Sequence, residues 1–448
     1  MLTIDTALDR LGDLVTRARA AGATAADALL VGSSSISAQV RLGKLEDLDR
    51  SEGQEIGLRV FIGQQVASVS TSDFSTAGFD NLVERVIAMA RMAPAEPYAG
   101  LAPEELLLRA PLPDLDLHDP TMPAADQLIH EALATEDAAR AVPGVTNSEG
   151  GAASAGHSLV AIATSHGVHA GYVSSSFSRS ATVVAAGNDG MERDYDYHVA
   201  RYHADLESPE TIGQRAGART VRRLNPVKLK SQTMPVVFDP RVASGLVSHL
   251  IGAITGSSIA RKSSFLLDRR GTAVFAPGIF LREEPHRVRG LRSRPMDAEG
   301  LPTRERAIIE DGVLTTWLME TASARQLGEQ PTGHASRGTS GPPGVSVSNL
   351  VLAPGKTSRA DMLAAIPNGV YVTELIGMGV NGVTGDYSRG AAGFLIENGE
   401  LTRPVAEVTI ASNLKEMFAT LSPADDLERR YGIDSPSLLV PAMTVAGN

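Results

Sequence analysis

The length of the chain, 448 residues, is the feature that most constrains its fold. A single hydrophobic core usually stops growing at about 250–300 residues, and longer chains divide into domains. The clearest change along the sequence follows Pro226, where a helical pattern gives way to a short basic stretch and then to the apolar run 235–238. We therefore expect two domains, comprising residues 1–225 and 226–448.

The N-terminal half combines helical and strand patterns. Apolar residues recur every three or four positions in some segments, and apolar and polar residues alternate in others. The helical pattern occupies residues 6–21, 79–92, 124–141 and 209–224, and the strand pattern occupies residues 28–31, 36–42, 56–69 and 146–184. Alternation of this kind is typical of strands that lay one face on a layer of helices. We predict a mixed sheet with helices in this half.

The C-terminal half is predicted to be rich in β-structure. A helix is expected at residues 241–254, and the segments after it are short because glycine and proline interrupt them. Residues 393–401 have the pattern of a strand, an Asn-Gly turn and a returning strand. The prediction for the whole chain is an α+β fold, with an N-terminal mixed sheet and helices followed by a barrel-like, β-rich domain.

The composition narrows both the chemistry and the location. The chain has no cysteine, which excludes disulfides and thiolate ligands, so a metal site would need histidine and carboxylate ligands. No apolar run reaches the roughly 20 residues that span a bilayer. Asp5, Asp9 and Asp13 interrupt the region where a secretory signal would be apolar. We expect a cytoplasmic protein without a membrane partner.

The charge of the chain argues against nucleic acid as a partner. Its formal net charge is −11 at pH 7, and binding to a phosphate backbone depends on lysine and arginine displacing counterions. Basic stretches do occur at residues 215–230 and 282–294, but acidic residues dilute the second. We expect no nucleic-acid partner.

One local candidate for metal chemistry is the pair His130-Glu131 in a predicted helix. Such a pair begins a zinc-protease motif when a second histidine follows one turn later. Residues 132–135 contain no histidine. We therefore interpret the pair as exposed residues on an amphipathic helix.

A second candidate is a group of histidines and acids in the predicted strands. It comprises His157, His166, His169, His198 and His203, with Glu192, Asp194 and Asp196 between them. Neutral imidazole is a common metal ligand, but residues an odd number apart in a strand point to opposite faces. Whether this region binds a metal is left open by the sequence.

Serine nucleophiles and nucleotide loops receive little support. The serine-rich stretches 174–176 and 257–258 lie outside any G-x-S-x-G turn. The chain also lacks the G-x-x-x-x-G-K-[ST] loop that cradles phosphates. Neither class of site is expected.

The most distinctive stretch is residues 377–390, which is rich in glycine. Its polar side chains could line a peptide-binding surface or a chamber, and they are Asn381, Thr384, Asp386, Ser388 and Arg389. Glycines permit close approach of backbone to ligand, but they also build tight turns. Both interpretations stand at this stage.

The stretch 384–390, Thr-Gly-Asp-Tyr-Ser-Arg-Gly, together with Gly393-Phe394 and the run 396–399, resembles the C-terminal signature of the TldD/PmbA family. Other elements agree in order along nearly the whole chain, and they are residues 57–60, 191–197, 264–266 and 294–300. The element 191–197 is more similar to the PmbA branch, also called TldE, than to the TldD branch.

The resemblance also identifies a departure from the family's metal motif. In the TldD branch, the helix after the domain boundary carries H-E-x-x-x-H, in which two histidines bind zinc and the glutamate activates water. The matching positions here are His249, Leu250 and Ile254. One imidazole cannot replace the missing ligand and base, so we predict no catalytic residue and no metal in this chain.

The resemblance implies a function that depends on a partner. A TldE-type chain pairs with a TldD-type subunit that carries zinc, and the complex degrades unfolded or short peptides and peptide precursors. We expect this chain to supply the partner interface and part of the peptide-binding chamber. Whether the isolated chain forms homodimers is left open.

Two alternatives use different chemistry. The chain could be a stand-alone peptide-binding or scaffold protein, in line with the family's older description as a modulator of gyrase. It could also be a self-sufficient metallopeptidase that uses the histidines between His157 and His203. Zinc in the purified chain alone would distinguish the second alternative from the others.

Overall fold

The computed structural model describes residues 2–188 and 190–447. Its N-terminal half contains a long, curved sheet with the strand order β3-β2-β1-β4-β5-β6, in which all neighbours run antiparallel. The strands are β1 (Ala25–Arg41), β2 (Lys44–Ile62), β3 (Gln65–Thr71), β4 (Asn147–Thr164), β5 (His169–Gly187) and β6 (Gly190–Ala200).

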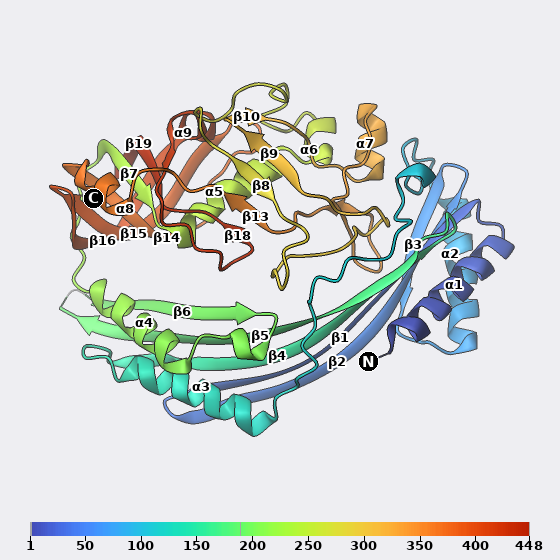
Figure 1. Cartoon of the computed structure of the whole chain (residues 1–448), viewed down its shortest axis with the longest axis horizontal. Helices are drawn as coiled ribbons and strands as arrows, with labels where there is room; N and C mark the ends of the chain where they lie inside the picture. The colour runs from blue at the N-terminus through green and yellow to red at the C-terminus, as the bar shows by residue number, and fades with distance from the viewer. Residues whose placement is uncertain (1, 189, 448) are drawn as a thin grey trace.

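Helices cover the outer face of this sheet, in two pairs at its two ends (Figure 1). They are α1 (Ile4–Ala20), α2 (Thr76–Met92), α3 (Ala125–Arg140) and α4 (Pro209–Arg222). Ala28 and Leu30 of β1 pack into the core under α1 and α2, whereas Leu29 packs on the opposite face with Met296 and Leu301. The alternation in the sequence therefore places one face of the sheet on helices and the other on the C-terminal half.

Two of the predicted strand boundaries are wrong. The predicted strands at residues 28–31 and 36–42 form the single strand β1, because Gly32 and Ser33 pair with β2 on one side and with β4 on the other. Residues 56–69 instead belong to two strands, since Gly63 adopts a φ of 60° and turns the chain from β2 into β3. Pairing on both edges stabilises small residues that look like breaks in the sequence.

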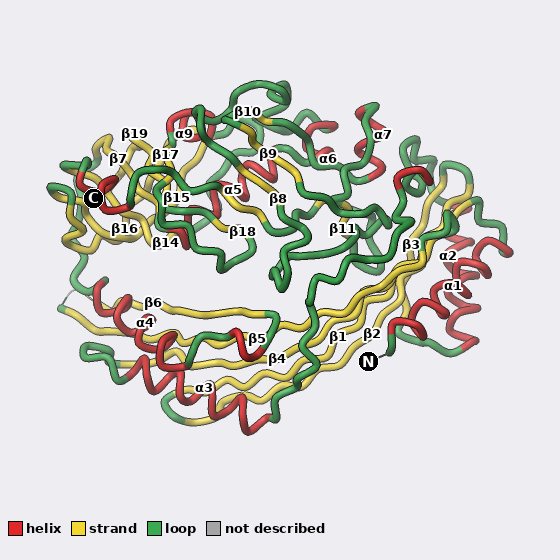
Figure 2. Tube along the Cα trace, viewed as in Figure 1, coloured by secondary structure: helices red, strands yellow, loops and turns green. Residues whose placement is uncertain are grey.

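The C-terminal half contains a barrel, which appears with the other strands in Figure 2. Its strands follow the order β16-β15-β14-β7-β19, and an additional pairing between β16 and β19 closes the ring. They are β7 (Gln232–Phe238), β14 (Asn368–Ile376), β15 (Asp386–Glu397), β16 (Glu400–Asn413) and β19 (Leu438–Ala446). The predicted α+β fold with a barrel-like C-terminal part is confirmed.

Smaller elements surround the barrel. A second sheet has the order β10-β9-β8-β13-β18 and comprises β8 (Leu281–Glu283), β9 (Arg306–Glu310), β10 (Val313–Leu314), β13 (Leu350–Leu352) and β18 (Ile433–Asp434). The short strands are β11 (Ala335–Ser336), β12 (Gly344–Val345) and β17 (Ser422–Pro423), and the short helices are η1 (Glu104–Leu106), η2 (His203–Asp205), α6 (Gly256–Ala260), α7 (Thr321–Leu327), α8 (Arg359–Ala364) and α9 (Leu414–Thr420).

Helix α5 (Pro240–Ala253) follows β7 and lies against the barrel. Its N-cap is Asp239, whose carboxylate accepts a hydrogen bond from the Arg241 amide. On its inner face, Leu246 and Leu250 join the core cluster that contains Phe238 of β7. This helix is the element on which the family resemblance places the metal motif.

Charged residues are buried where the two halves of the chain meet. Asp27 of β1 lies between Arg59 of β2 and Arg337, with ion-pair distances of 2.5 Å and 2.8 Å. Arg59 also lies 3.8 Å from Glu299. We call these four residues the buried seam, because two belong to the N-terminal sheet and two to the C-terminal half.

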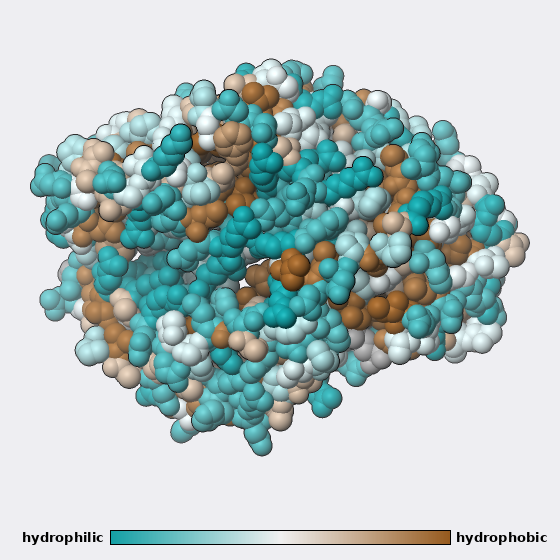
Figure 3. All heavy atoms as spheres, viewed as in Figure 1, coloured by the Kyte–Doolittle hydropathy of each residue, from teal (hydrophilic) through white to brown (hydrophobic). Residues whose placement is uncertain are grey.

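The visible surface is predominantly hydrophilic and is hollowed between the N-terminal sheet and the barrel-containing half (Figure 3). None of the described helices has both the length and the apolar character that crossing a bilayer requires. One cavity described below is lined by residues of both halves, from β6 on one side and from α5 and β14 on the other.

Candidate functional site

The residues of α5 that match the metal motif do not form a ligand set. Leu250 is fully buried in the core, and so is Ile254 immediately after the helix. Their side chains are apolar and face the barrel, so neither can hold a cation or activate water. Of the motif positions, only His249 has its side chain at a cavity. The residues at these positions do not fit a zinc ion.

His249 lies between an aromatic ring and a cation. Its imidazole meets the buried Tyr387 ring edge-on, with ring centroids 6.0 Å apart. Burial lowers the pKa of His249, and the positive charge of Arg389 lowers it further. The imidazole is therefore neutral at neutral pH, and neither of its ring nitrogens has a hydrogen-bond partner among the described residues.

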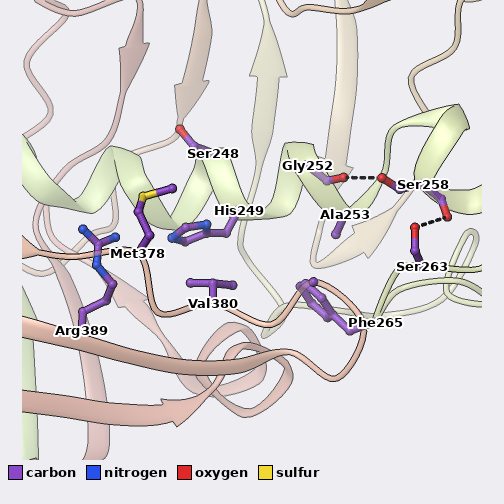
Figure 4. Close-up of a pocket in the computed structure, with 11 residues that line it drawn as sticks. Ser248, His249, Gly252, Ala253, Ser258, Ser263, Phe265, Met378, Val380 and Arg389 are labelled. Atoms are coloured by element: carbon purple, nitrogen blue, oxygen red, sulfur yellow. Dashed lines mark hydrogen bonds between the residues drawn. The ribbon is translucent and has the colours of Figure 1, made fainter.

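A first cavity of about 320 Å³ opens beside His249. Its lining residues come from α5, from the segment around α6 and from the glycine-rich stretch, and they are Ser248, His249, Gly252, Ala253, Ser258, Ser263, Phe265, Met378, Val380, Gly382 and Arg389. Figure 4 shows Arg389 reaching towards Met378 and His249, with Val380 and Phe265 along the same wall. Arg389 is the sole side chain of this lining that is charged at neutral pH.

The serines of this wall are already hydrogen-bonded to backbone. Ser258 donates its hydroxyl to the Gly252 carbonyl at 3.2 Å, and Ser263 donates to the Ser258 carbonyl at 3.3 Å. Ser248 donates to the Ser244 carbonyl at 3.0 Å. These hydroxyls hold the helix end and the following turn in place, and none lies in a nucleophile arrangement with a base.

The glycine-rich stretch is a tightly folded loop that leads into β15. Asn381 accepts hydrogen bonds from the amides of Val383 and Thr384, and Thr384 donates its hydroxyl to Asp386 at 2.6 Å. Asn413 donates to the other oxygen of the Asp386 carboxylate at 3.1 Å. The side chains of Asn381, Thr384 and Asp386 therefore bind to their own loop and to the adjoining strand.

Two glycines explain the composition of this loop. Gly379 approaches β15 so closely that a Cβ atom would lie 1.6 Å from the Ser388 carbonyl oxygen. Gly385 adopts a φ of 86°, which side chains disfavour. Of the predicted site residues in the stretch, Ser388 is exposed on β15, with its amide bonded to the Gly379 carbonyl, and Arg389 reaches the cavity.

Arg389 differs from the other arginines beside α5 in having no acidic partner among the described residues. Its Nε donates a long hydrogen bond of 3.4 Å to the Ile376 carbonyl. Among the residues that the structure describes, no carboxylate forms an ion pair with it. Its guanidinium therefore retains donors that point towards the first cavity.

A second cavity of about 410 Å³ lies on the other side of Arg389, between α5, β6 and β14. The other arginines that line it are all paired. Arg241 lies 3.0 Å from Asp194, Arg223 lies 2.5 Å from Glu374, and Arg193 lies 3.4 Å from Glu149. Arg389 thus lines both cavities and has no ion-pair partner among the described residues. The other arginines of the second cavity each form an ion pair with a carboxylate.

The other local candidates have structural partners. His130 is exposed, but the expectation of an exposed His-Glu pair is wrong for Glu131, which is 8% exposed. Its carboxylate lies 3.0 Å from Arg179 and 2.9 Å from His203. Burial of Glu131 is tolerated because Arg179 supplies a positive charge and both Arg179 and His203 donate hydrogen bonds to the carboxylate.

The histidines between residues 157 and 203 are dispersed over the N-terminal sheet. His157, His166 and His169 bond to the carbonyls of Thr121, Ala102 and Leu8. His198 accepts a hydrogen bond from the Glu207 amide. Within residues 2–188 and 190–447, no three histidine, aspartate or glutamate side chains come together in a way that could hold a metal ion.

Sequence reasoning missed several residues of the first cavity. Met378 is 94% exposed at its mouth, and Val380 forms part of its wall. Tyr387 lies within the family motif; among the described residues its buried hydroxyl has no hydrogen-bond partner, and its ring contacts His249. Phe265 could have been indicated by its place in the family-like run 264–266. In the structure its amide donates a hydrogen bond to the Gly382 carbonyl of the glycine-rich loop.

Comparison with known proteins decides the family. The models for PmbA/TldA metallopeptidase domain 1, central domain and C-terminal domain match residues 26–90, 118–224 and 231–447. The chain belongs to the PmbA/TldD family. This confirms the resemblance that the sequence motifs indicated.

Relatives that match it over most of their length are named PmbA. It is 40% identical over 417 residues to Metalloprotease PmbA of Escherichia coli O157:H7, which covers 93% of this chain and 90% of that protein. It is 38% identical over 437 residues to a Metalloprotease PmbA homolog of Haemophilus influenzae, with 97% and 94% covered. Homologues of this PmbA/TldD chain are thus named as metalloproteases.

Solved structures share the fold over the whole chain. A candidate modulator of DNA gyrase from Bacteroides thetaiotaomicron has a TM-score of 0.92 and 28% identity, and all of both chains is covered. TldE from Thermococcus kodakarensis has a TM-score of 0.87 and 21% identity, with 98% of this chain and 100% of that chain covered. The second comparison shows a shared fold.

Proposed function

We propose that this PmbA/TldD chain is the metal-free, non-catalytic subunit of a TldD/TldE-type heterodimeric zinc metallopeptidase. The complex acts on unfolded or short peptides and on peptide precursors in the cytoplasm. The zinc and the water-activating glutamate reside in the TldD-type partner, and this chain contributes chamber wall and substrate-binding surface.

One observation carries the proposal. At the positions where the TldD branch has the glutamate base and the second histidine, Leu250 and Ile254 are fully buried in the barrel core. Supplying a ligand there would require a charged or polar group in an apolar core, which is costly without a partner. His249 remains at the cavity, but the guanidinium of Arg389 beside it disfavours a metal cation.

The proposal is tested by measuring zinc content and peptidase activity together. The chain is purified alone, and then mixed with a TldD-type chain that carries H-E-x-x-x-H, with an unstructured peptide as substrate. We expect the chain alone to hold no stoichiometric zinc and to cleave nothing, and the mixture to cleave. Zinc-dependent cleavage by the lone chain would contradict the proposal.

A matched pair of variants makes the test specific. His249→Ala in this chain should leave the zinc content and the presence of cleavage in the mixture unchanged. Substitution of the first motif histidine in the TldD-type partner should abolish both, because two histidine ligands and the base are needed there. If His249→Ala removed zinc from the mixture, the metal site would include this chain.

A further inference from the structure

Arg389 and the first cavity together have the properties of a site for a small anion with an apolar body. The guanidinium is planar and offers paired donors that match a carboxylate. Its charge is not neutralised by any described carboxylate. The remaining wall is largely apolar near Phe265 and Val380, with Met378 at the mouth.

The single positive charge of the first cavity favours a ligand that carries one negative charge. Arg389 is the sole cationic lining residue, because burial and the Arg389 charge keep the pKa of His249 below its usual value. A phosphate carries up to two negative charges at neutral pH and would leave one without a partner. A carboxylate balances the single guanidinium, and the neutral imidazole can donate a further hydrogen bond to it.

The volume of the first cavity favours the terminal residue of a peptide over a longer segment. Its volume of about 320 Å³ lies at the lower limit of ligand pockets, which hold roughly 300–1,000 Å³. It is suited to one apolar residue rather than to an extended segment. The loop from Met378 to Gly382 and the α6 segment close the wall around that residue.

We propose that the first cavity binds the C-terminal residue of a peptide, with the α-carboxylate on the Arg389 guanidinium and an apolar side chain against Phe265 and Val380. This rests on the proposed function, because it names the substrate feature that the non-catalytic subunit recognises. The cavity beside His249 thereby anchors the free end of the peptide.

The test measures binding to the isolated full chain by isothermal titration calorimetry, without partner or zinc. The probes are acetyl-Ala-Ala-Phe with a free C-terminal carboxylate, the same peptide as its C-terminal amide, and acetyl-Ala-Glu-Phe amide, whose acid is internal. We expect the free acid to bind at least about tenfold more tightly than either amide, which corresponds to about 1.4 kcal/mol.

Four variants locate the effect. Arg389→Gln should abolish the preference for the free acid, and Arg389→Lys should retain part of it because the charge remains without the paired donors. Gly252→Leu should weaken all binding by filling the cavity, since a Cβ atom at Gly252 meets nothing within 4 Å. Gly245→Leu is the matched control, because Gly245 lies on the same helix, has equally free space and lines the second cavity.

Several outcomes would overturn the proposal. They are equal affinity for acid and amide, equal affinity for the internal acid, a preference that survives Arg389→Gln, and no measurable binding of any probe. Because these measurements use no partner, they are independent of the proposed subunit role. An acid preference without cleavage in the mixed complex would retain the carboxylate site and contradict the metallopeptidase role.

Discussion

The buried seam and the first cavity use arginine in opposite ways. In the seam, Arg59 and Arg337 are nearly inaccessible and share Asp27, while Glu299 supplies the second negative charge. At the cavity, Arg389 faces a recess and has no acidic partner among the described residues. Paired, desolvated arginines fix the structure, whereas an accessible unpaired one is available for a ligand. Substitutions should separate the two roles.

The largest effect is expected at the centre of the seam. Asp27→Asn leaves Arg59 and Arg337 with one negative charge between them, and removal of one partner from a buried pair costs about 3–5 kcal/mol. The free energy of unfolding, measured with urea, should fall by that amount. Asp47→Asn on the exposed part of β2 is the control and should change stability by less than about 0.5 kcal/mol. If both variants lowered the free energy of unfolding equally, the buried seam would not be a special source of stability.

A second buried pair predicts a pH dependence. Glu283 accepts hydrogen bonds from His334 at 2.6 Å and from the Ser348 amide at 2.6 Å. Although burial raises the pKa of Glu283, these partners outweigh it and lower the pKa to about 2 from the ordinary 4.5. A depressed carboxyl pKa stabilises the fold above pH 4.5, and this contribution is lost as the pH falls towards 2.

The pH prediction is measured against a variant. The stability advantage of the natural chain over Glu283→Gln should be greatest above pH 5, with about 3 kcal/mol from the pKa shift, and should shrink between pH 4.5 and pH 2. Urea unfolding at a series of pH values measures it. A difference that stays constant with pH would show that the carboxylate charge is not the stabilising feature.

The wall of the first cavity should tolerate added volume. Gly252→Ala places a methyl group where nothing lies within 4 Å and raises helix propensity, so we expect a gain of up to about 1 kcal/mol in unfolding free energy. Thermal unfolding measures the change. A loss of stability would indicate that this wall is part of the packed core and would weaken its contrast with the seam.

The smallest stability effect is expected at Arg389 itself. Arg389→Gln removes a weak hydrogen bond and no ion pair, so the unfolding free energy should change by less than about 0.5 kcal/mol. Thermal unfolding of this variant beside Asp27→Asn compares the two kinds of arginine environment directly. A change of several kcal/mol would assign Arg389 to the structure rather than to a ligand.

The sequence could predict the elements whose signal is local. The helix expected at residues 241–254 is α5 (Pro240–Ala253), because its apolar spacing and the cap at Asp239 act within a few residues. The strand break expected after residue 31 was wrong, since Gly32 is stabilised by pairing with Gln54 and Leu159, which are distant in sequence. Small residues in a central strand cannot be distinguished locally from a turn.

The sequence indicated which residues belong to the glycine-rich stretch, but it did not indicate which of their side chains point into the cavity. Asn381, Thr384, Asp386 and Arg389 look alike as polar residues of one glycine-rich stretch, but three of them bond to their own loop and one reaches the cavity. The seam was not predicted, because Asp27 and Arg337 are separated by most of the chain. Contacts of that kind depend on how the N-terminal sheet meets the loops of the C-terminal half.

The burial of Leu250 has a consequence for protein engineering. Rebuilding H-E-x-x-x-H in α5 would require both Leu250→Glu and Ile254→His, and each change places a polar group in the barrel core. Either substitution made first would lower stability before any metal could compensate for it. A route to a zinc-binding version of this chain would have to repack the barrel beneath the helix before the ligands were introduced.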